Sequence, residues 1–455
     1  MATKLLLAIF ASLLISYGAC QQQPLRKSRQ EQQCRLLQVA ARQPSRWLES
    51  EGGRLEMWDE NEQQFRCAGV AAFRIVVQPN SLALPNFQTS PRLVYILQGE
   101  GILGMSFTGC PETYHSSQRG GEEQAGGSRA EDMHQKVHRI RKGDIVAVPA
   151  GTAHWCYNDG SETMVAVAVH DLNNQANQMD QNLRTFFLAG GVPRGLTQPW
   201  LKGGETIQNV LAAFDPELMA ESFGVSIDTM SRLQKEDERG FIVRVERMKI
   251  TRPEEEEEFE AGEEHERREK QENRFERTVC NPRLHINLDA RRETDVFSRQ
   301  AGRLTVVNEQ KLPFLRFIGM SAEKGHLYPN AIYSPHWANS HSVVYVTRGS
   351  ARVQLVGSRG QTVMDDRVGE GDMFVIPQFF ASMCRAGSDG FEFVSIKTTS
   401  SPMKSHTVGR TSVLKAMPLQ VIANSYGVSM SEAYGIKQNR GRQHVFLSPV
   451  RRDRS

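Results

Sequence analysis

The chain has 455 residues, which is enough for two or three domains with sizeable cores. Its 55 basic and 52 acidic residues leave a net charge of +3. Such a balance gives no case for binding nucleic acid or an anionic membrane surface.

The first 20 residues have the pattern of a secretory signal peptide. Lys4 precedes an apolar run at 5–15, and small residues follow this run as far as Cys20. The run is shorter than the ~20 apolar residues that a spanning helix needs, and no other segment is apolar enough to cross a membrane. We therefore expect cleavage between Cys20 and Gln21 and entry into the secretory pathway.

Six of the seven cysteines remain after this cleavage: Cys34, Cys67, Cys110, Cys156, Cys280 and Cys384. An even number in a secreted chain favours disulfides, but the sequence alone does not set the pairing. Cys156 and Cys384 follow apolar strands at matching places of an internal repeat, so we expect them to be buried free thiols. The cysteines lack the close spacing of a zinc site.

The chain contains two copies of one pattern. Three pairs of segments match in order along it: 94–99 with 344–349, 143–144 with 371–372, and 220–226 with 423–429. The separation shrinks along the chain, so the first copy carries extra residues. One insertion, at 116–130, is too polar to order itself.

Each copy begins with short strands. Val70–Val77, 93–97 and Asp144–Val148 are rich in β-branched residues and are bounded by Gly, Pro or Asn. Many short strands separated by turns indicate a sandwich or a barrel. The fold class expected is therefore mainly β.

The end of each copy is predicted to be helical. Apolar residues recur every three or four positions in 206–214 and in Pro216–Phe223. Gly224 would end the second of these helices, and Asp228 could cap another. The pattern recurs at 418–426, again followed by a glycine.

A charge-dense block at 253–275 separates the two copies. It has almost no apolar content, so we interpret it as a solvated, disordered linker; a helix with alternating charge is the alternative. In either form it is exposed to proteases.

The most informative segment is 143–158. Its spacing of Gly143, Pro149, Gly151, His154 and Asn158 resembles the second motif of the cupin superfamily. A second copy begins at residue 371. It keeps Gly371 and Pro377, but Phe379, Ser382 and Ala386 stand in place of Gly151, His154 and Asn158.

The residues that a cupin needs for a metal are mostly absent. Such a site takes two His and a Glu from a first motif and one His from the second, a ligand set that suits Mn, Fe, Cu or Zn. In the first copy the segment 84–92 has neither His nor an acidic residue, which leaves His154 alone. In the second copy His336 and His341 lack a Glu, and Ser382 replaces the second-motif His. We therefore expect no metal and no other cofactor. A serine elbow and a phosphate loop are also missing from the sequence.

Taken together, the segments of the chain resemble the legumin-type (11S) seed storage globulins, which are built from two cupin modules. The likeness runs from about Cys34 to the C-terminus. It rests on these segments: 50–53, 64–69, 93–104, 109–114, 154–159, 188–191, 297–302, 334–336 and 417–421.

The resemblance implies two jelly-roll modules, each followed by a small helical extension. It divides the chain into a signal peptide at 1–20, a first module at 21–250, an acidic linker at 251–279 and a second module at 280–455. It also implies two disulfides that spacing alone does not give. These are Cys34–Cys67 within the first module and Cys110–Cys280 between the modules.

The function implied is storage of nitrogen and carbon in the protein storage vacuoles of seeds, without catalysis. An asparaginyl endopeptidase would cut after Asn273 into an acidic and a basic chain. Arg274 departs from the family here, because Gly usually follows this Asn. Homo- or hetero-trimers of related chains would become hexamers after the cut.

Two alternatives stay open from the residues. One is a metal-dependent bicupin oxidase or decarboxylase, which would need the missing ligands. The other is a metal-free cupin that binds a small ligand, because barrel interiors can hold ligands.

Overall fold

The computed structural model describes residues 36, 38–112, 114–115, 133–191, 208–235, 239–246, 248, 280 and 282–449. Several predicted features lie outside these residues. They are the signal peptide with Cys20 and Gln21, Cys34, the insertion at 116–130, and the linker at 253–275 with Asn273 and Arg274. Within the described ranges, no helix has both the length and the hydropathy to cross a membrane.

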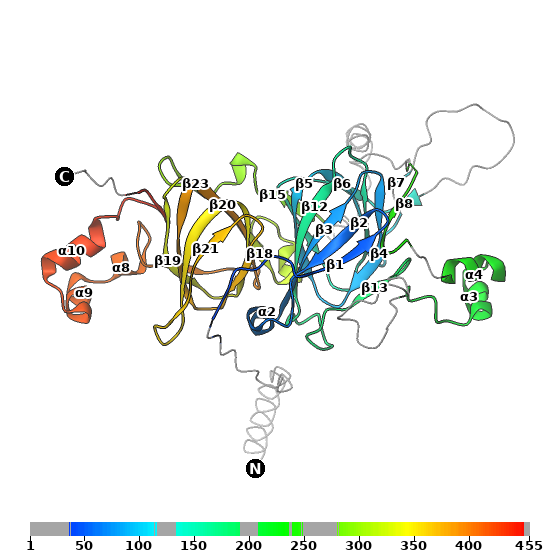
Figure 1. Cartoon of the computed structure of the whole chain (residues 1–455), viewed down its shortest axis with the longest axis horizontal. Coiled ribbons are helices and arrows are strands. Elements are labelled where there is room, and N and C mark those ends of the chain that lie inside the picture. Colours follow the sequence, from blue (N-terminus) through cyan, green and yellow to red (C-terminus); the bar gives the residue numbers. More distant parts are fainter. Residues whose placement is uncertain are drawn as a thin grey trace, which may run out of the picture. The chain divides into compact units, whose positions relative to one another are not determined.

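The first module is mainly β, with two short helices, α3 and α4, before its last strand (Figure 1). Its elements are β1 Arg46–Ser50, β2 Gly53–Met57, α2 Gln63–Ala68, β3 Val70–Val77, β4 Ser81–Gln88, β5 Arg92–Gln98, β6 Glu100–Ser106, β7 Tyr114–His115, β8 Met133–His134, β9 Val137–Arg141, β10 Asp144–Val148, β11 Ala153–Asn158, β12 Met164–Asp171, β13 Thr185–Phe187, α3 Pro216–Phe223, α4 Ile227–Gln234 and β14 Ile242–Arg244.

The second module repeats this order with longer strands. Its elements are β15 His285–Asn287, the 3₁₀ turn η1 Arg291–Glu293, β16 Val296–Ser298, β17 Gly302–Val307, α7 Leu315–Ile318, β18 Ser321–Leu327, β19 Ile332–Ala338, β20 Ser342–Val356, β21 Thr362–Gly369, β22 Met373–Ile376, β23 Ala381–Lys397, β24 Lys404–His406, α8 Val413–Ala416, α9 Leu419–Tyr426, α10 Met430–Gln438 and β25 Phe446–Leu447.

The strands of the first module form two facing sheets. One has the order β1-β2-β3-β12-β5-β10-β15, and the other has the order β13-β4-β11-β6-β9 with β14 beside β4. In the second module β16-β17-β18-β23-β19-β24 form one continuous sheet, to which β20, β21, β22 and β25 add. The ladders pair antiparallel strands, as in a jelly roll. The expected mainly β fold with two such modules is confirmed.

The modules exchange strands at their junction. β15 follows the linker in sequence, yet it pairs with β10 of the first module. In the opposite direction, Arg42 bridges Met373 of the second module. One apolar core runs through both modules, with Phe65 and Leu93 in the first and Leu315 in the second, and each is fully buried. Because burial of apolar area is the main stabilising term in folding, this shared core holds the two sheets together.

The predicted strands match the structure closely. β3 and β10 have the expected bounds, and residues 93–97 lie within β5. The helix predicted over Pro216–Phe223 is α3, which ends at Gly224 in a left-handed conformation. The helix predicted at 418–426 is α9, with Pro418 at its N-cap.

Two helix predictions were wrong. Residues 208–214 form turns instead of a helix, because the backbone of Asn209 bridges Phe187 and its side chain accepts a hydrogen bond from the N–H of Leu211. The cap of α4 is Ser226, whose hydroxyl accepts from the N–H of Thr229, whereas Asp228 lies in the first turn.

Candidate functional site

The second-motif turn is the part of each copy in which glycine has a clear backbone role. Gly143 and Gly371 have φ of 90° and 86°, a region that favours glycine. Gly151 has φ of 72°, and a side chain built there would meet nothing within 4 Å. This open space explains why Phe379 can stand at the matching place with φ of 66° and an exposed ring. The cost is backbone strain, which no glycine would carry.

Asn158 has a structural role at the end of β11. Its amide donates to the carbonyls of Val77 and Glu162 at 2.9 Å each, and its oxygen accepts from the N–H of Gly160 at 3.0 Å. The side chain therefore fixes a turn and is not directed at a ligand.

His154 lies on β11 and points into the barrel of the first module. Its Nδ1–H donates to the carbonyl of Thr152 at 3.0 Å, so Nε2 carries the lone pair. A guanidinium N–H of Arg92, from β5, donates to that Nε2. Burial, together with the charge of Arg92, lowers the pKa of His154 to about 3, so the ring is neutral. The lone pair that would hold a metal is occupied by a protein cation.

Arg92 is the buried cation of this barrel. Burial lowers the pKa of its guanidinium to about 10, and no carboxylate among the described residues faces it. His170, directly opposite on β12, is also buried and neutral, because burial and the charge of Arg92 lower its pKa well below the usual range. As far as the described residues show, the interior is therefore positive and lacks the carboxylate that a cupin metal site requires.

In the second module Ser382 stands at the place of His154, and the histidine here is His336, which lies opposite Ser382 on β19. Its Nδ1 bonds the carbonyl of Ser334 at 2.8 Å, and its Nε2 faces the hydroxyl of Ser382 at 3.3 Å. His336 and Ser382 are paired across β19 and β23. His341 is engaged elsewhere, because its Nδ1 accepts from the N–H of Gln378. The two histidines that the segment offered as possible ligands thus bond different partners.

Sequence reasoning missed a buried ion cluster in this barrel, formed by Glu323, Lys397 and Lys404. The carboxylate of Glu323 lies 3.4 Å from the ammonium of Lys397 and is hydrogen-bonded to that of Lys404. Lys404 also donates to the hydroxyl of Tyr333 at 2.6 Å, and Lys397 to that of Ser342 at 2.9 Å. One available signal was Lys397 itself, a charged residue at the end of β23 directly after Val394, Ser395 and Ile396.

Charge balance in the Glu323 cluster keeps the carboxylate ionised. Burial alone would raise its pKa, but Lys397 and Lys404 outweigh burial and hold it at about 2. Burial lowers the pKa of Lys404 to about 7, against the opposing effect of Glu323. The carboxylate that could serve a metal is thus bound by two lysines.

Neither barrel fits the metal that its fold family implies. The first offers an imidazole nitrogen bound to a guanidinium, and the second an imidazole nitrogen facing a hydroxyl. Throughout the described ranges, no group of three or more His, Cys, Asp or Glu side chains could hold a metal ion.

Comparison with known proteins settles the family. The cupin family model matches residues 39–194 and 286–433. The chain is 50% identical to "11S globulin seed storage protein 2" of Sesamum indicum over 98% of both chains. The chain belongs to the 11S globulins, the seed storage proteins of the cupin family.

Two solved structures extend the comparison. The crystal structure of the coconut allergen cocosin is 41% identical, with a TM-score of 0.80 over 91% of this chain and 100% of that one. An 11S globulin from Wrightia tinctoria is 36% identical, with a TM-score of 0.79 over 91% of this chain and 96% of that one, and its structure is described as revealing an auxin binding site.

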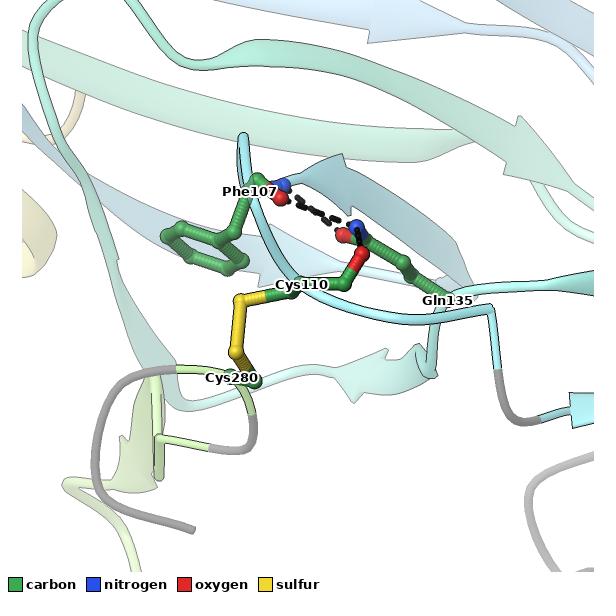
Figure 2. Close-up of a disulfide and its surroundings, with 4 residues drawn as sticks. All are labelled: Phe107, Cys110, Gln135 and Cys280. Atoms are coloured by element: carbon green, nitrogen blue, oxygen red, sulfur yellow. Dashed lines mark hydrogen bonds between the residues drawn. A yellow bond between two sulfur atoms is a disulfide. The ribbon is translucent and has the colours of Figure 1, made fainter. Parts of the chain in front are cut away.

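A disulfide links the two modules of this 11S globulin. Cys110 and Cys280 are joined with an S–S distance of 2.01 Å (Figure 2). The amide of Gln135 holds the loop before the bridge, because it donates to the carbonyls of Phe107 and Cys110 and accepts from the N–H of Phe107. Cys67 is also disulfide-bonded, and its expected partner Cys34 lies outside the described residues.

Cys156 and Cys384 are free thiols. Cys384 is buried as expected, whereas Cys156 is only partly buried. Burial raises the pKa of both thiols to about 12, so neither is a reactive thiolate at neutral pH.

Proposed function

We propose that this seed storage globulin is a non-catalytic reserve, deposited in the storage vacuole and digested at germination. The observation that carries the proposal is the content of the two barrels, where Arg92 and the Glu323 cluster occupy the interior in place of a metal site. Storage needs a compact fold that resists premature unfolding, and a buried shared core and disulfides provide this.

Elemental analysis tests the absence of a catalytic metal. Purified protein is incubated with Mn, Fe, Cu or Zn, dialysed, and measured beside the His154→Ala variant. We expect no stoichiometric metal in either protein. One metal ion per chain, lost in the variant, would support the bicupin oxidase or decarboxylase instead.

Assembly is proposed to use the helical ends of the modules. Apolar side chains on these helices are exposed in the single chain: Leu218, Phe223, Ile227 and Leu233 in the first module, and Val421, Tyr426, Met430, Tyr434 and Ile436 in the second. Exposed apolar faces of this kind mark interaction sites. A head-to-tail contact between the first module of one chain and the second of the next closes into a ring, here a homo- or hetero-trimer.

Light scattering tests this trimer. The Leu218→Asp variant should be monomeric where the wild type is trimeric. The matched Met403→Asp variant, at an exposed residue outside these helices, should remain trimeric. A wild type that is monomeric at every concentration would refute the proposal.

Maturation is proposed to follow the family route. The signal at 1–20 would be removed between Cys20 and Gln21, and an asparaginyl endopeptidase would cut between Asn273 and Arg274. The Cys110–Cys280 bridge would keep the acidic and basic chains together, and hexamers would follow. Intact mass with and without reductant, and sedimentation before and after the cut, test these steps; a protein cut after Asn273 that stays trimeric would contradict the last one.

A second candidate function is the binding of a small organic molecule in the barrel of the first module. A cavity of about 140 Å³ with an incompletely paired Arg92 in its wall favours it. The auxin binding site described for the Wrightia tinctoria globulin also supports the binding of a small organic molecule.

A further inference from the structure

The cavity in the first barrel lies between the two sheets and is mainly apolar. Its lining includes Ile75, Val94, Ile96, Leu103, Val148 and Met164. Its volume of about 140 Å³ is close to that of an engineered apolar cavity that binds benzene, about 150 Å³. A molecule with one six-membered ring therefore matches the available space.

Polar groups in the wall of this cavity have unused hydrogen-bonding capacity. Within the described part of the chain, Nε of Arg92, Oδ1 of Asn86 and Oε1 of Gln88 are buried without a hydrogen-bond partner. Their other polar atoms are engaged: the amide of Asn86 donates to the carbonyl of Leu84 at 2.9 Å, and that of Gln88 to the hydroxyl of Thr185 at 3.3 Å. Buried groups of this kind are normally satisfied, so each requires a partner.

An anion would complete the hydrogen bonding of Arg92. The residue is 9% exposed, and the only hydrogen bond found for its guanidinium among the described residues is to neutral His154. His154 is a positioning residue, because its Nε2 fixes one N–H and leaves Nε–H to donate elsewhere. A carboxylate would supply both the acceptor and the charge that a buried guanidinium requires. A metal cation or an amine would be repelled by the same charge.

The two amide oxygens add a second requirement. Asn86 and Gln88 lie on β4 and present acceptors, so the ligand needs a hydroxyl or an N–H that donates to them. An aromatic acid with a hydroxyl group meets both demands and leaves its ring for the apolar wall.

We propose that the first barrel binds a small aromatic monocarboxylic acid, with its carboxylate on Arg92 and a hydroxyl donor toward Asn86 and Gln88. This inference rests on the second candidate function, and it names the ligand class and the anchoring residue.

Calorimetric titration of the full chain tests the proposal with three probes. 4-Hydroxybenzoate and benzoate carry the carboxylate, and benzamide is its neutral counterpart of equal size. We expect one site per chain, binding of 4-hydroxybenzoate tighter than that of benzoate, and at least tenfold weaker binding of benzamide. Arg92→Met should lose carboxylate binding, whereas Arg352→Met, at an exposed ion-paired arginine, should retain it.

The outcomes distinguish the carboxylate site from the more general proposal that the first barrel binds a small molecule. Equal binding of benzamide and benzoate, or unchanged benzoate binding by Arg92→Met, overturns the carboxylate site but leaves a ligand-binding barrel. Absence of binding by all three probes at millimolar concentration overturns both. If Arg92→Met fails to fold, Ala166→Leu, which fills the cavity and keeps Arg92, must abolish benzoate binding; retained binding would overturn the site equally.

Discussion

Replacement of Glu323 by glutamine removes the only negative charge of the Glu323 cluster and keeps its shape. Lys397 and Lys404 then face each other in the barrel without a counter-ion, with side chains 2% and 13% exposed. An uncompensated buried charge is far more costly than a lost surface contact. We expect Glu323→Gln to destabilise the second module strongly.

The size of the loss follows from the pKa of Glu323. The folded protein lowers it from 4.5 to about 2. One pKa unit corresponds to 1.36 kcal/mol, so the cluster favours the ionised carboxylate by about 3 kcal/mol. This agrees with the ~3–5 kcal/mol lost when one partner of a buried ion pair is removed. Lys404 has a pKa of about 7 and can release its proton in the variant, which places the expected loss near the lower end.

The pH dependence of this loss has a definite sign. A carboxylate with a depressed folded pKa contributes its full stability above its unfolded pKa, here about 4.5, and loses it as the pH falls through about 2. The contribution of Glu323 to the gap in unfolding free energy between wild type and Glu323→Gln should therefore be complete above pH 5 and should narrow from pH 4.5 downward.

Urea unfolding of the uncleaved protein at a fixed concentration measures the gap at each pH. Asp365→Asn is the matched control, because Asp365 pairs with Arg352 on the exposed surface and its loss should leave the midpoint unchanged. A loss below about 1 kcal/mol for Glu323→Gln, or a gap that does not narrow in acid, would refute the reasoning.

Three further outcomes are expected. Lys404→Met should cost less than Glu323→Gln, because it leaves a one-to-one pair. It should also remove the rise in stability between about pH 7 and 10.5 that a lysine with a lowered folded pKa gives; persistence of that rise in urea titrations would exclude Lys404 as its source. Phe379→Gly should raise the unfolding free energy by about 1 kcal/mol, because it relieves a left-handed φ and loses little packing; a lower urea midpoint would contradict this. Cys280→Ser should lower stability by about 3–5 kcal/mol, since the bridge spans 170 residues; equal midpoints under non-reducing conditions would contradict a stabilising bridge.

Most of the fold could be predicted from the sequence, because alternation and turn residues carry local information. The bounds of β3 and β10, and the stop at Gly224, came directly from such patterns. The strand exchange at the module junction could not, because pairing between β15 and β10 depends on residues far apart in the chain. The prediction of a helix at 206–214 was wrong over 208–214 for the same reason, since the contact of Asn209 with Phe187 overrides the helical periodicity.

The barrel contents were predictable only in part. The sequence lacks the His and Glu residues that a first cupin motif would supply beside His154, since the segment 84–92 has none. It did not show what replaced them, because Arg92 and Lys397 are ordinary residues until the strands pair. Arg92 and Lys397 then belong to equivalent cross-strand pairs of the two modules. Arg92 pairs with His170 across β5 and β12, and Ser342 pairs with Lys397 across β20 and β23.

This shared position explains why the two barrels differ chemically. In each module one strand of the pair supplies a buried cation and the other a neutral hydrogen-bonding group, but the strands have exchanged roles. In the second module Glu323 neutralises the cation from β18, at the place where Phe73 packs edge-on against His170 in the first. In the second barrel the buried lysines therefore have a carboxylate partner within the module, and a cavity of only about 40 Å³ remains. The first barrel has Phe73 where the carboxylate would be, so no described residue at this place neutralises Arg92, and the proposed carboxylate ligand would do so.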